Sequence, residues 1–168
     1  MQLRQIDKAR YDKHFKITFA AIIAFMLVVS LGVSNLLIQL IGNPGGNNFW
    51  LNVTGVILAA LAVAALIRRY RAHPFLTEVM YVWDLKQGLN RIHRKQRKIK
   101  AAVAQGDRNA TIIMNYHYQA SRQLYELDNN TITLDDLAKA EREFQAQMAE
   151  HGVSVTLEEF DPKLLERY

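Results

Sequence analysis

Few residues in this sequence have the types and spacing that catalysis or metal binding requires. The chain has no cysteine, which excludes a disulfide, a thiolate metal site and a cysteine nucleophile. Glycine-rich phosphate loops and the segments G-x-S-x-G and H-E-x-x-H are also missing from the sequence. The five histidines include no pair at the i, i+4 spacing that places two ligands on one helix face: His14, His73, His93, His117 and His151. We therefore expect no catalytic, cofactor-binding or metal-binding residue and a protein that is not an enzyme.

Two positions come closest to such a site. The loop that begins at Asp128 has oxygen ligands at its first and third positions, as an EF-hand does. However, Thr133 stands where that calcium loop needs glycine, and Lys139 stands where it needs an acid. His117 lies on an apolar stripe between two tyrosines, which is typical of a hydrogen-bonded core histidine. We expect neither position to bind a metal.

The densest group of functional side chains is basic. Residues 68–100 carry a net charge of +8, whereas residues 101–168 carry −6. Within the first block, a stretch without any acid contains seven candidate partner-binding residues: Lys86, Arg91, Arg94, Lys95, Arg97, Lys98 and Lys100.

Three kinds of partner fit this basic run. Anionic lipid requires a helix that lies flat on the membrane, because surface attraction fades within about 8–10 Å. Nucleic acid or a ribosome is a second option, since a basic helical face is the electrostatic footprint of such binding. The third is protein, either a neighbouring chain or this chain's own acidic segment. We expect a solvated face that complements the acidic segment, whose acids are Asp135, Asp136, Glu141, Glu143 and Glu150.

Two long uncharged stretches supply the elements that position this run. The overall composition, 50% hydrophobic and 22% charged, matches a soluble protein only as an average. Residues 17–41 and 49–67 contain no charged residue, and about 20 apolar residues cross a bilayer as a helix. The connecting residues 42–48 are mainly Gly, Asn and Pro, which form tight turns. The pattern predicts a transmembrane hairpin over residues 17–67.

The distribution of Lys and Arg predicts the orientation of this hairpin. Basic residues precede the first stretch and follow the second, whereas the turn has none: Arg4, Lys8, Arg10, Lys13, Lys16, Arg68, Arg69 and Arg71. Because basic flanks stay on the cytoplasmic side, we expect residues 1–16 to form a basic cytoplasmic N-terminus. The first stretch is also much longer than the roughly 7–15 apolar residues of a signal peptide. We therefore expect it to be retained as a span, with both termini in the cytoplasm.

The predicted spans contain polar residues but no ionisable ones, which argues against a proton or ion pathway. We expect the polar side chains to pack helices, within the hairpin or against a neighbour: Ser30, Ser34, Asn35, Gln39, Asn52 and Thr54. A polar groove for a quinone, a lipid or the spans of a partner is the alternative. Small residues four apart, such as Gly55 and Ala59, also favour close helix packing.

The remaining residues predict a small all-α cytoplasmic domain over residues 68–151. Apolar residues at three- and four-residue spacing indicate a long helix from Pro74 to about residue 103. Gly106 and Asp107 then stop this helix and cap a second one, which we expect to pack antiparallel to the first. A capping-box pattern at Thr133 opens a shorter third helix. Residues 152–168 form a tail with signals for a short terminal helix, among them Asp161-Pro162.

Five short strings along the chain carry a family resemblance: Ile6-Asp-Lys8, Asn35-Leu-Leu-Ile38, Glu78-Val-Met-Tyr-Val-Trp83, Leu89-Asn-Arg-Ile92 and Leu127-Asp-Asn-Asn-Thr-Ile-Thr133. With these strings, the sequence resembles a bacterial family of two-span inner-membrane proteins, domain of unknown function family 3087, over nearly its whole length. The resemblance implies a bacterial inner-membrane setting and brings no catalytic residue.

These observations lead to one expected function and one alternative. We expect a non-enzymatic, membrane-anchored interaction protein that serves as an accessory subunit or adaptor of an inner-membrane complex. Its partner would be another protein or a second copy of the chain, with no small-molecule substrate. The alternative is a module that binds nucleic acid, a ribosome or anionic lipid through residues 86–100.

Overall fold

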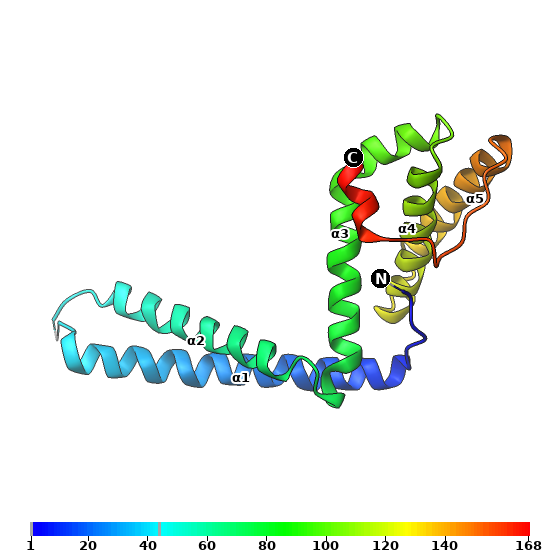
Figure 1. Cartoon of the computed structure of the whole chain (residues 1–168). Coiled ribbons are helices and arrows are strands. Elements are labelled where there is room, and N and C mark those ends of the chain that lie inside the picture. The colour runs from blue at the N-terminus through cyan, green and yellow to red at the C-terminus, as the bar shows by residue number, and fades with distance from the viewer. Residues whose placement is uncertain (1, 44) are drawn as a thin grey trace. The chain divides into compact units, whose positions relative to one another are not determined.

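The computed structural model describes residues 2–43 and 45–168, and within them the chain is all-helical with no strand. This confirms the predicted fold class. The elements are α1 (Lys8–Ile41), α2 (Phe49–Tyr70), the 3₁₀ helix η1 (Pro74–Leu76), α3 (Thr77–Val103), α4 (Arg108–Leu127), α5 (Leu134–Glu150) and the 3₁₀ helix η2 (Pro162–Arg167). They form two compact units (Figure 1). We call residues 9–80 the hairpin unit, and residues 2–8 with 81–168 the helical unit.

In the hairpin unit, α1 and α2 are each long and apolar enough to cross a membrane. Their large apolar side chains lie on the outside: Val28 and Ile41 are each 72% exposed. The predicted turn over residues 42–48 is closed by its asparagines, since the Asn48 side chain bonds the backbone N–H and carbonyl of Asn43. Pro44, which belongs to this prediction, lies outside the described residues.

One close approach joins the two hairpin helices. Gly55 and Ala59 of α2 are buried, as is Ser34 of α1. A Cβ atom at Gly55 would lie 2.1 Å from Ser34 Oγ and 2.8 Å from the carbonyl oxygen of Ser30. Because no side chain fits in that space, glycine sets the separation of the helices here.

The helical unit is organised around α4, which lies between α3 and α5 (Figure 1). Gly106 takes a positive φ of 78°, and the Asp107 side chain accepts a hydrogen bond from the Ala110 N–H, so the predicted stop and cap are confirmed. Tyr81 Oη donates to Gln123 Oε1 over 2.7 Å, and Gln96 lies against His117. These pairs show that α3 and α4 run antiparallel, as the sequence predicts.

Aromatic contacts hold the remaining elements against α4. The ring of Tyr118 packs on Phe144 of α5, with centroids 5.2 Å apart. The ring of Tyr116 stacks on Phe160 at 3.8 Å, which fixes the segment that enters η2. Phe144 and Phe160 are both buried, so α5 and the tail complete the core.

The predicted capping box at Thr133 is wrong, although a helix does begin there. Thr133 has helical backbone angles (φ −89°, ψ −5°), and its side chain makes no cap hydrogen bond. A capping residue needs an extended backbone to turn its oxygen toward the first free N–H groups. Asp135 and Asp136 still lie in the first turn, where negative charge favours a helix. At the tail, Asp161 caps η2 through Lys163 N–H, as the sequence indicates.

The start of the chain folds into the helical unit, which the sequence does not predict. The Arg4 N–H donates to Tyr81 Oη over 2.9 Å. The Gln123 side-chain amide donates to the Arg4 carbonyl over 2.5 Å. Since Tyr81 Oη also donates to Gln123, the three residues form one closed network, which we call the N-terminal clamp.

Candidate functional site on helix α3

The candidate site is the side of α3 that points away from the core. The buried face of this helix includes Val82, Leu85, Leu89, Ile92 and Ile99. On the opposite side, Trp83 is 57% exposed, and the arginines of the basic run are exposed as well. Trp83 and Arg94 are eleven residues apart, close to three turns of helix, so they share one side. We call Trp83, Arg91, Arg94 and Arg97 the outer face.

The acidic segment does not cover this face. Its buried acid, Glu141 of α5, accepts hydrogen bonds from two side chains of α4 instead, Gln119 at 2.9 Å and Arg122. Within the described residues, no ion pair joins the basic run to an acid of α5. The helix that carries the acidic segment, α5, packs on α4.

Three lysines of the basic run are used within the fold. Lys86 forms an ion pair with Asp128 at 2.8 Å. Lys95 Nζ donates to the Leu165 carbonyl over 2.7 Å, and Lys98 Nζ donates to the backbone oxygen of Tyr168 over 3.0 Å. The last two bonds hold η2 against α3 (Figure 1). Lys100, the last member of the run, is exposed in the final turn of α3.

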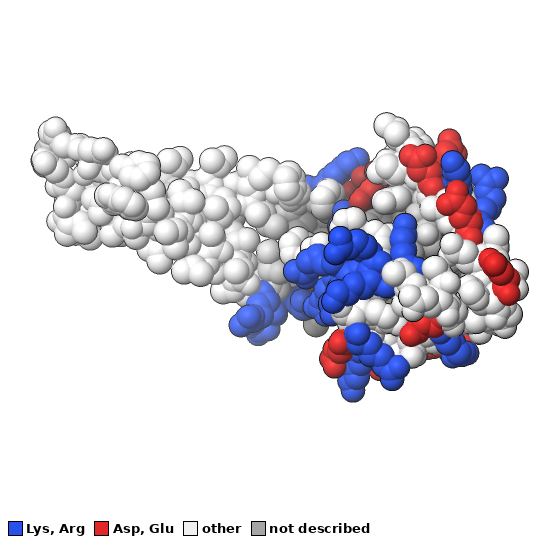
Figure 2. Space-filling model, turned by 90° about the horizontal axis from the view of Figure 1, so that it is seen from above, with Lys and Arg blue, Asp and Glu red and all other residues white. Residues whose placement is uncertain are grey.

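The arginines of the run remain directed outward. Arg91, Arg94 and Arg97 are exposed and make no hydrogen bond or ion pair within residues 2–43 and 45–168. Figure 2 shows a dense group of basic side chains on the helical unit, with acids scattered around it, and a hairpin surface without charge over most of its length. Because guanidinium groups can bind carboxylate or phosphate with two parallel hydrogen bonds, this face is suited to an acidic partner.

The tail is further tied to the start of α4. Tyr168 Oη donates to Asp107 Oδ1 over 3.1 Å, and Arg108 pairs with Glu159 at 2.6 Å. Burial, together with the nearby Asp107, raises the pKa of Tyr168 to about 12. The bond from the Ala110 N–H lowers the pKa of Asp107, so this carboxylate stays charged as it caps α4.

The histidine predicted to be a core residue is half-buried on α4, beside Gln96 of α3. Gln96 Nε2 lies 3.4 Å from His117 Nε2, so the amide can donate to that ring nitrogen. Burial, helped by the nearby charges of Lys100 and His93, lowers the pKa of His117 to about 4. Its neighbours Tyr116 and Tyr118 have raised pKa values because they too are buried. Each of the two tyrosine rings packs on a different phenylalanine, and the described residues contain no cluster suited to a metal ion.

The polar residues of the two spans lie in different settings. Ser34 is buried, and its hydroxyl donates to the Asn52 carbonyl of α2 over 3.4 Å. The hydroxyls of Ser30 and Thr54 bond carbonyls of their own helices, Leu27 and Trp50. Four of the six side chains are exposed: Asn35, Gln39, Asn52 and Thr54. Of these six described residues, Ser34 is the one whose side chain bonds the other helix of the hairpin.

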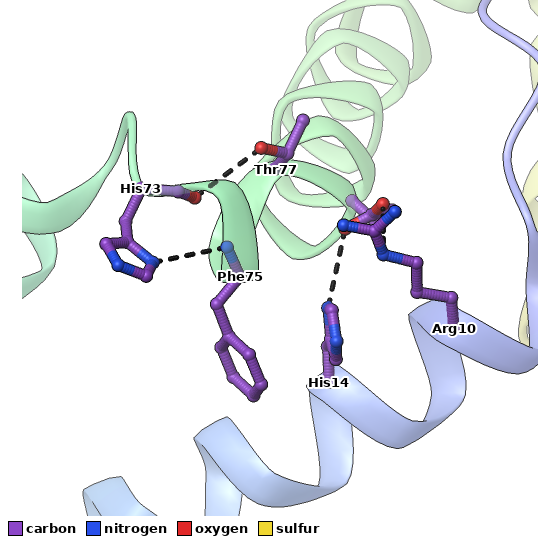
Figure 3. Close-up of polar contacts among 6 residues, drawn as sticks. Arg10, His14, His73, Phe75 and Thr77 are labelled. Carbon is purple, nitrogen blue, oxygen red and sulfur yellow. Dashed lines mark hydrogen bonds and ion pairs between the residues drawn. The ribbon is translucent and has the colours of Figure 1, made fainter.

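A second polar cluster, which the sequence reasoning missed, lies in the hairpin unit. Glu78, at the start of α3, is buried; its carboxylate is 3.0 Å from Arg10 Nε and 3.5 Å from His14 Nδ1 (Figure 3). The His14 ring stacks on Phe75 of η1 with centroids 4.1 Å apart. We call Arg10, His14 and Glu78 the collar. Its sequence signal was the i, i+4 spacing of Arg10 and His14 on α1.

Comparison with known proteins identifies the family but no activity. No match was found among the curated proteins or the solved structures. The family model described as "Protein of unknown function (DUF3087)" matches residues 1–165. The two apolar helices followed by a helical unit, together with this match over nearly the whole sequence, show that the chain belongs to the DUF3087 family.

Proposed function

We propose that this protein is a membrane-anchored, non-enzymatic interaction protein, an accessory subunit or adaptor of a bacterial inner-membrane complex. In this proposal α1 and α2 cross the membrane, both chain ends are cytoplasmic, and the outer face of α3 binds an acidic surface of a protein partner. The observation that carries the proposal is the uncovered outer face, which combines an exposed tryptophan with three unpaired arginines.

The outward apolar surface and the charges support the membrane part. Large apolar side chains cover α1 and α2 on the outside, where water would oppose them and lipid would not. Basic residues lie before the first uncharged stretch and after the second, and the turn between the stretches carries none: Lys13, Lys16, Arg68, Arg69 and Arg71. The N-terminal clamp gives independent support, because residues 2–8 and 81–168 can fold together only on one side of a membrane.

The composition of the outer face favours a protein partner. Trp and Arg are the residues most enriched where protein interfaces derive their binding energy. Residues 81–168 carry thirteen basic and thirteen acidic side chains, so the domain lacks the strong net positive charge of a nucleic-acid binder. A local basic face on a neutral domain is suited to a partner with a local acidic face.

The test is partner capture from native membranes by the tagged full-length protein. Arg94→Glu/Arg97→Glu reverses two charges on the outer face, and Lys139→Glu/Arg142→Glu reverses two exposed charges on α5 as a matched control. We expect the first variant to lose the co-purifying protein by about tenfold or more and the control to retain it. Equal retention by both variants, or recovery of RNA in place of protein, would contradict the proposal.

A further inference from the structure

The hairpin unit contains an apolar groove at its charged end. The groove has a volume of about 430 Å³, within the range of roughly 300–1,000 Å³ that holds small molecules. Aliphatic and aromatic side chains of α1 and α2 form its walls, including Ala21, Phe25, Val63 and Ile67. Phe75 and Leu76 of η1 also line it.

The polar groups of this lining are Thr18, Tyr70 and His73. The guanidinium of Arg69 lies over the Tyr70 ring, 5.8 Å from its centroid. His73 Nδ1 accepts a hydrogen bond from the Phe75 N–H over 3.2 Å, as Figure 3 shows. The neutral His73 ring therefore carries its proton on Nε2, which is a donor. The site thus combines apolar walls with a cation, Arg69, and an N–H donor, His73.

The collar holds part of this lining in place. Phe75 stacks on His14, and the ion pair between Glu78 and Arg10 joins the first turn of α3 to α1. The Thr77 hydroxyl also bonds the carbonyl of His73 over 3.5 Å. Because these contacts fix η1 from both sides, closing the groove would require breaking them. The groove is therefore preformed and remains open along one side.

We propose that this groove binds an acyl chain of an anionic phospholipid, whose phosphate lies against Arg69 and His73. The apolar walls suit a hydrocarbon chain, and no acid occurs in the lining. Arg68 and Arg69 add positive charge at the adjoining end of α2, and the cytoplasmic leaflet is the one rich in anionic lipid. A helix from a second copy is about 10 Å across and would have to displace Phe75, which the collar holds.

The proposal rests on the membrane insertion proposed above but does not depend on the protein partner. The experiment is native mass spectrometry of the full-length protein in neutral detergent with added dioleoyl phosphatidylglycerol, dioleoyl phosphatidylcholine or inorganic phosphate. The two lipids have the same acyl chains and differ in head-group charge. We expect retention of phosphatidylglycerol about tenfold above phosphatidylcholine, and no adduct with phosphate alone.

Variants in the groove and at its charged end test the two parts of the proposed site separately. Ala21→Phe fills the groove, and Ala24→Phe adds the same ring to α1 at an exposed position outside the lining. We expect Ala21→Phe to lose about tenfold in phosphatidylglycerol binding, and Ala24→Phe to bind like the wild type. Arg69→Gln/His73→Gln should bring the two lipids within about twofold of each other.

Several outcomes would overturn the proposal. Equal retention of the two lipids by the wild-type protein would do so, and this result requires no variant to fold. Phosphatidylglycerol binding by Ala21→Phe at the wild-type level would do so as well. A wild-type dimer that becomes a lipid-free monomer on Ala21→Phe would show that a second copy fills the groove. Since Ala21→Phe leaves the outer face intact, it should still capture the protein partner, so the two proposals can fail separately.

Discussion

The hairpin unit and the helical unit are built from similar helices but bury different surfaces. In the hairpin, Val28 and Ile41 are each 72% exposed, and small residues make the contact between the helices. In the helical unit, Leu85, Ile92 and Ile113 are fully buried. The comparison shows that similar apolar residues form the outer surface of the hairpin unit and the core of the helical unit. The first arrangement suits the lipid surroundings proposed for the hairpin, and the second suits water.

The difference also determines which positions each unit depends on. In the proposed membrane setting, lipid would provide no hydrophobic drive between the helices, so the hairpin would depend on the close backbone approach at Gly55. The helical unit depends on large side chains that fill its core, such as Phe144 and Phe160. Stability should therefore respond to different kinds of substitution in the two units.

The largest expected effect comes from removing the same side chain in each unit. Leu85 is fully buried in α3, whereas Leu61 of α2 is 61% exposed. We expect Leu85→Ala to lower the free energy of unfolding of the helical unit by about 2–5 kcal/mol, and Leu61→Ala to change stability little. Urea denaturation of the full-length protein in detergent measures both, followed by hydrogen exchange in α4 for Leu85→Ala and in α2 for Leu61→Ala. Equal losses would show that Leu61 is covered by protein.

The second expected effect is a response to pH that is confined to the helical unit. The pKa of His117 is lowered to about 4, whereas an unfolded histidine titrates near 6.5. The unfolded chain therefore binds a proton in this window that the folded chain does not bind. Stability is full above about pH 6.5 and falls by an amount on the order of 3 kcal/mol as the pH drops to about 4.

The measurement is urea unfolding of the helical unit between pH 4 and pH 7. Changing His117 to Gln removes the titrating group, so the variant should lose this part of the pH dependence. His151, which is exposed, provides the matched control through His151→Gln. A variant at His117 that keeps the full acid sensitivity would show that another group is responsible.

The smallest expected effect tests the close approach in the hairpin. A Cβ at Gly55 would meet Ser34 Oγ at 2.1 Å, whereas a Cβ at Gly32 would meet nothing within 4 Å. We expect Gly55→Ala to separate the helices and cost about 1–3 kcal/mol, and Gly32→Ala to be neutral or slightly stabilising. A disulfide between cysteines introduced at positions 30 and 55 cannot test this contact, because the cysteine at position 55 would itself replace the glycine. Thermal unfolding in detergent of the two alanine variants is the direct comparison, and identical melting temperatures would refute the contact.

Much of the helical framework could be predicted from the sequence because local signals determine it. The apolar spacing from Val82 to Val103 predicts the buried face of α3. Gly106 and Asp107 predict where α3 ends and α4 begins. Such signals act within a few residues, so they can be read without knowing the fold.

The contacts that assemble the candidate site are long-range and could not be predicted in this way. Lys95 and Lys98 each bond a backbone oxygen 70 residues away, so these two lysines of the basic run are used within the fold. Glu141 interrupts an apolar stripe in the sequence, and only the structure shows that Arg122 and Gln119 of α4 satisfy it. A charge count cannot distinguish side chains that hold the fold together from those that remain directed outward.

The N-terminal clamp has a consequence for the order of synthesis. Arg4 is synthesised well before its hydrogen-bond partners, Tyr81 and Gln123. Both apolar helices lie between them in the chain and must be made first. Arg4 therefore reaches its final place only after residue 123 has been made, and the helical unit closes only after the hairpin has been translated.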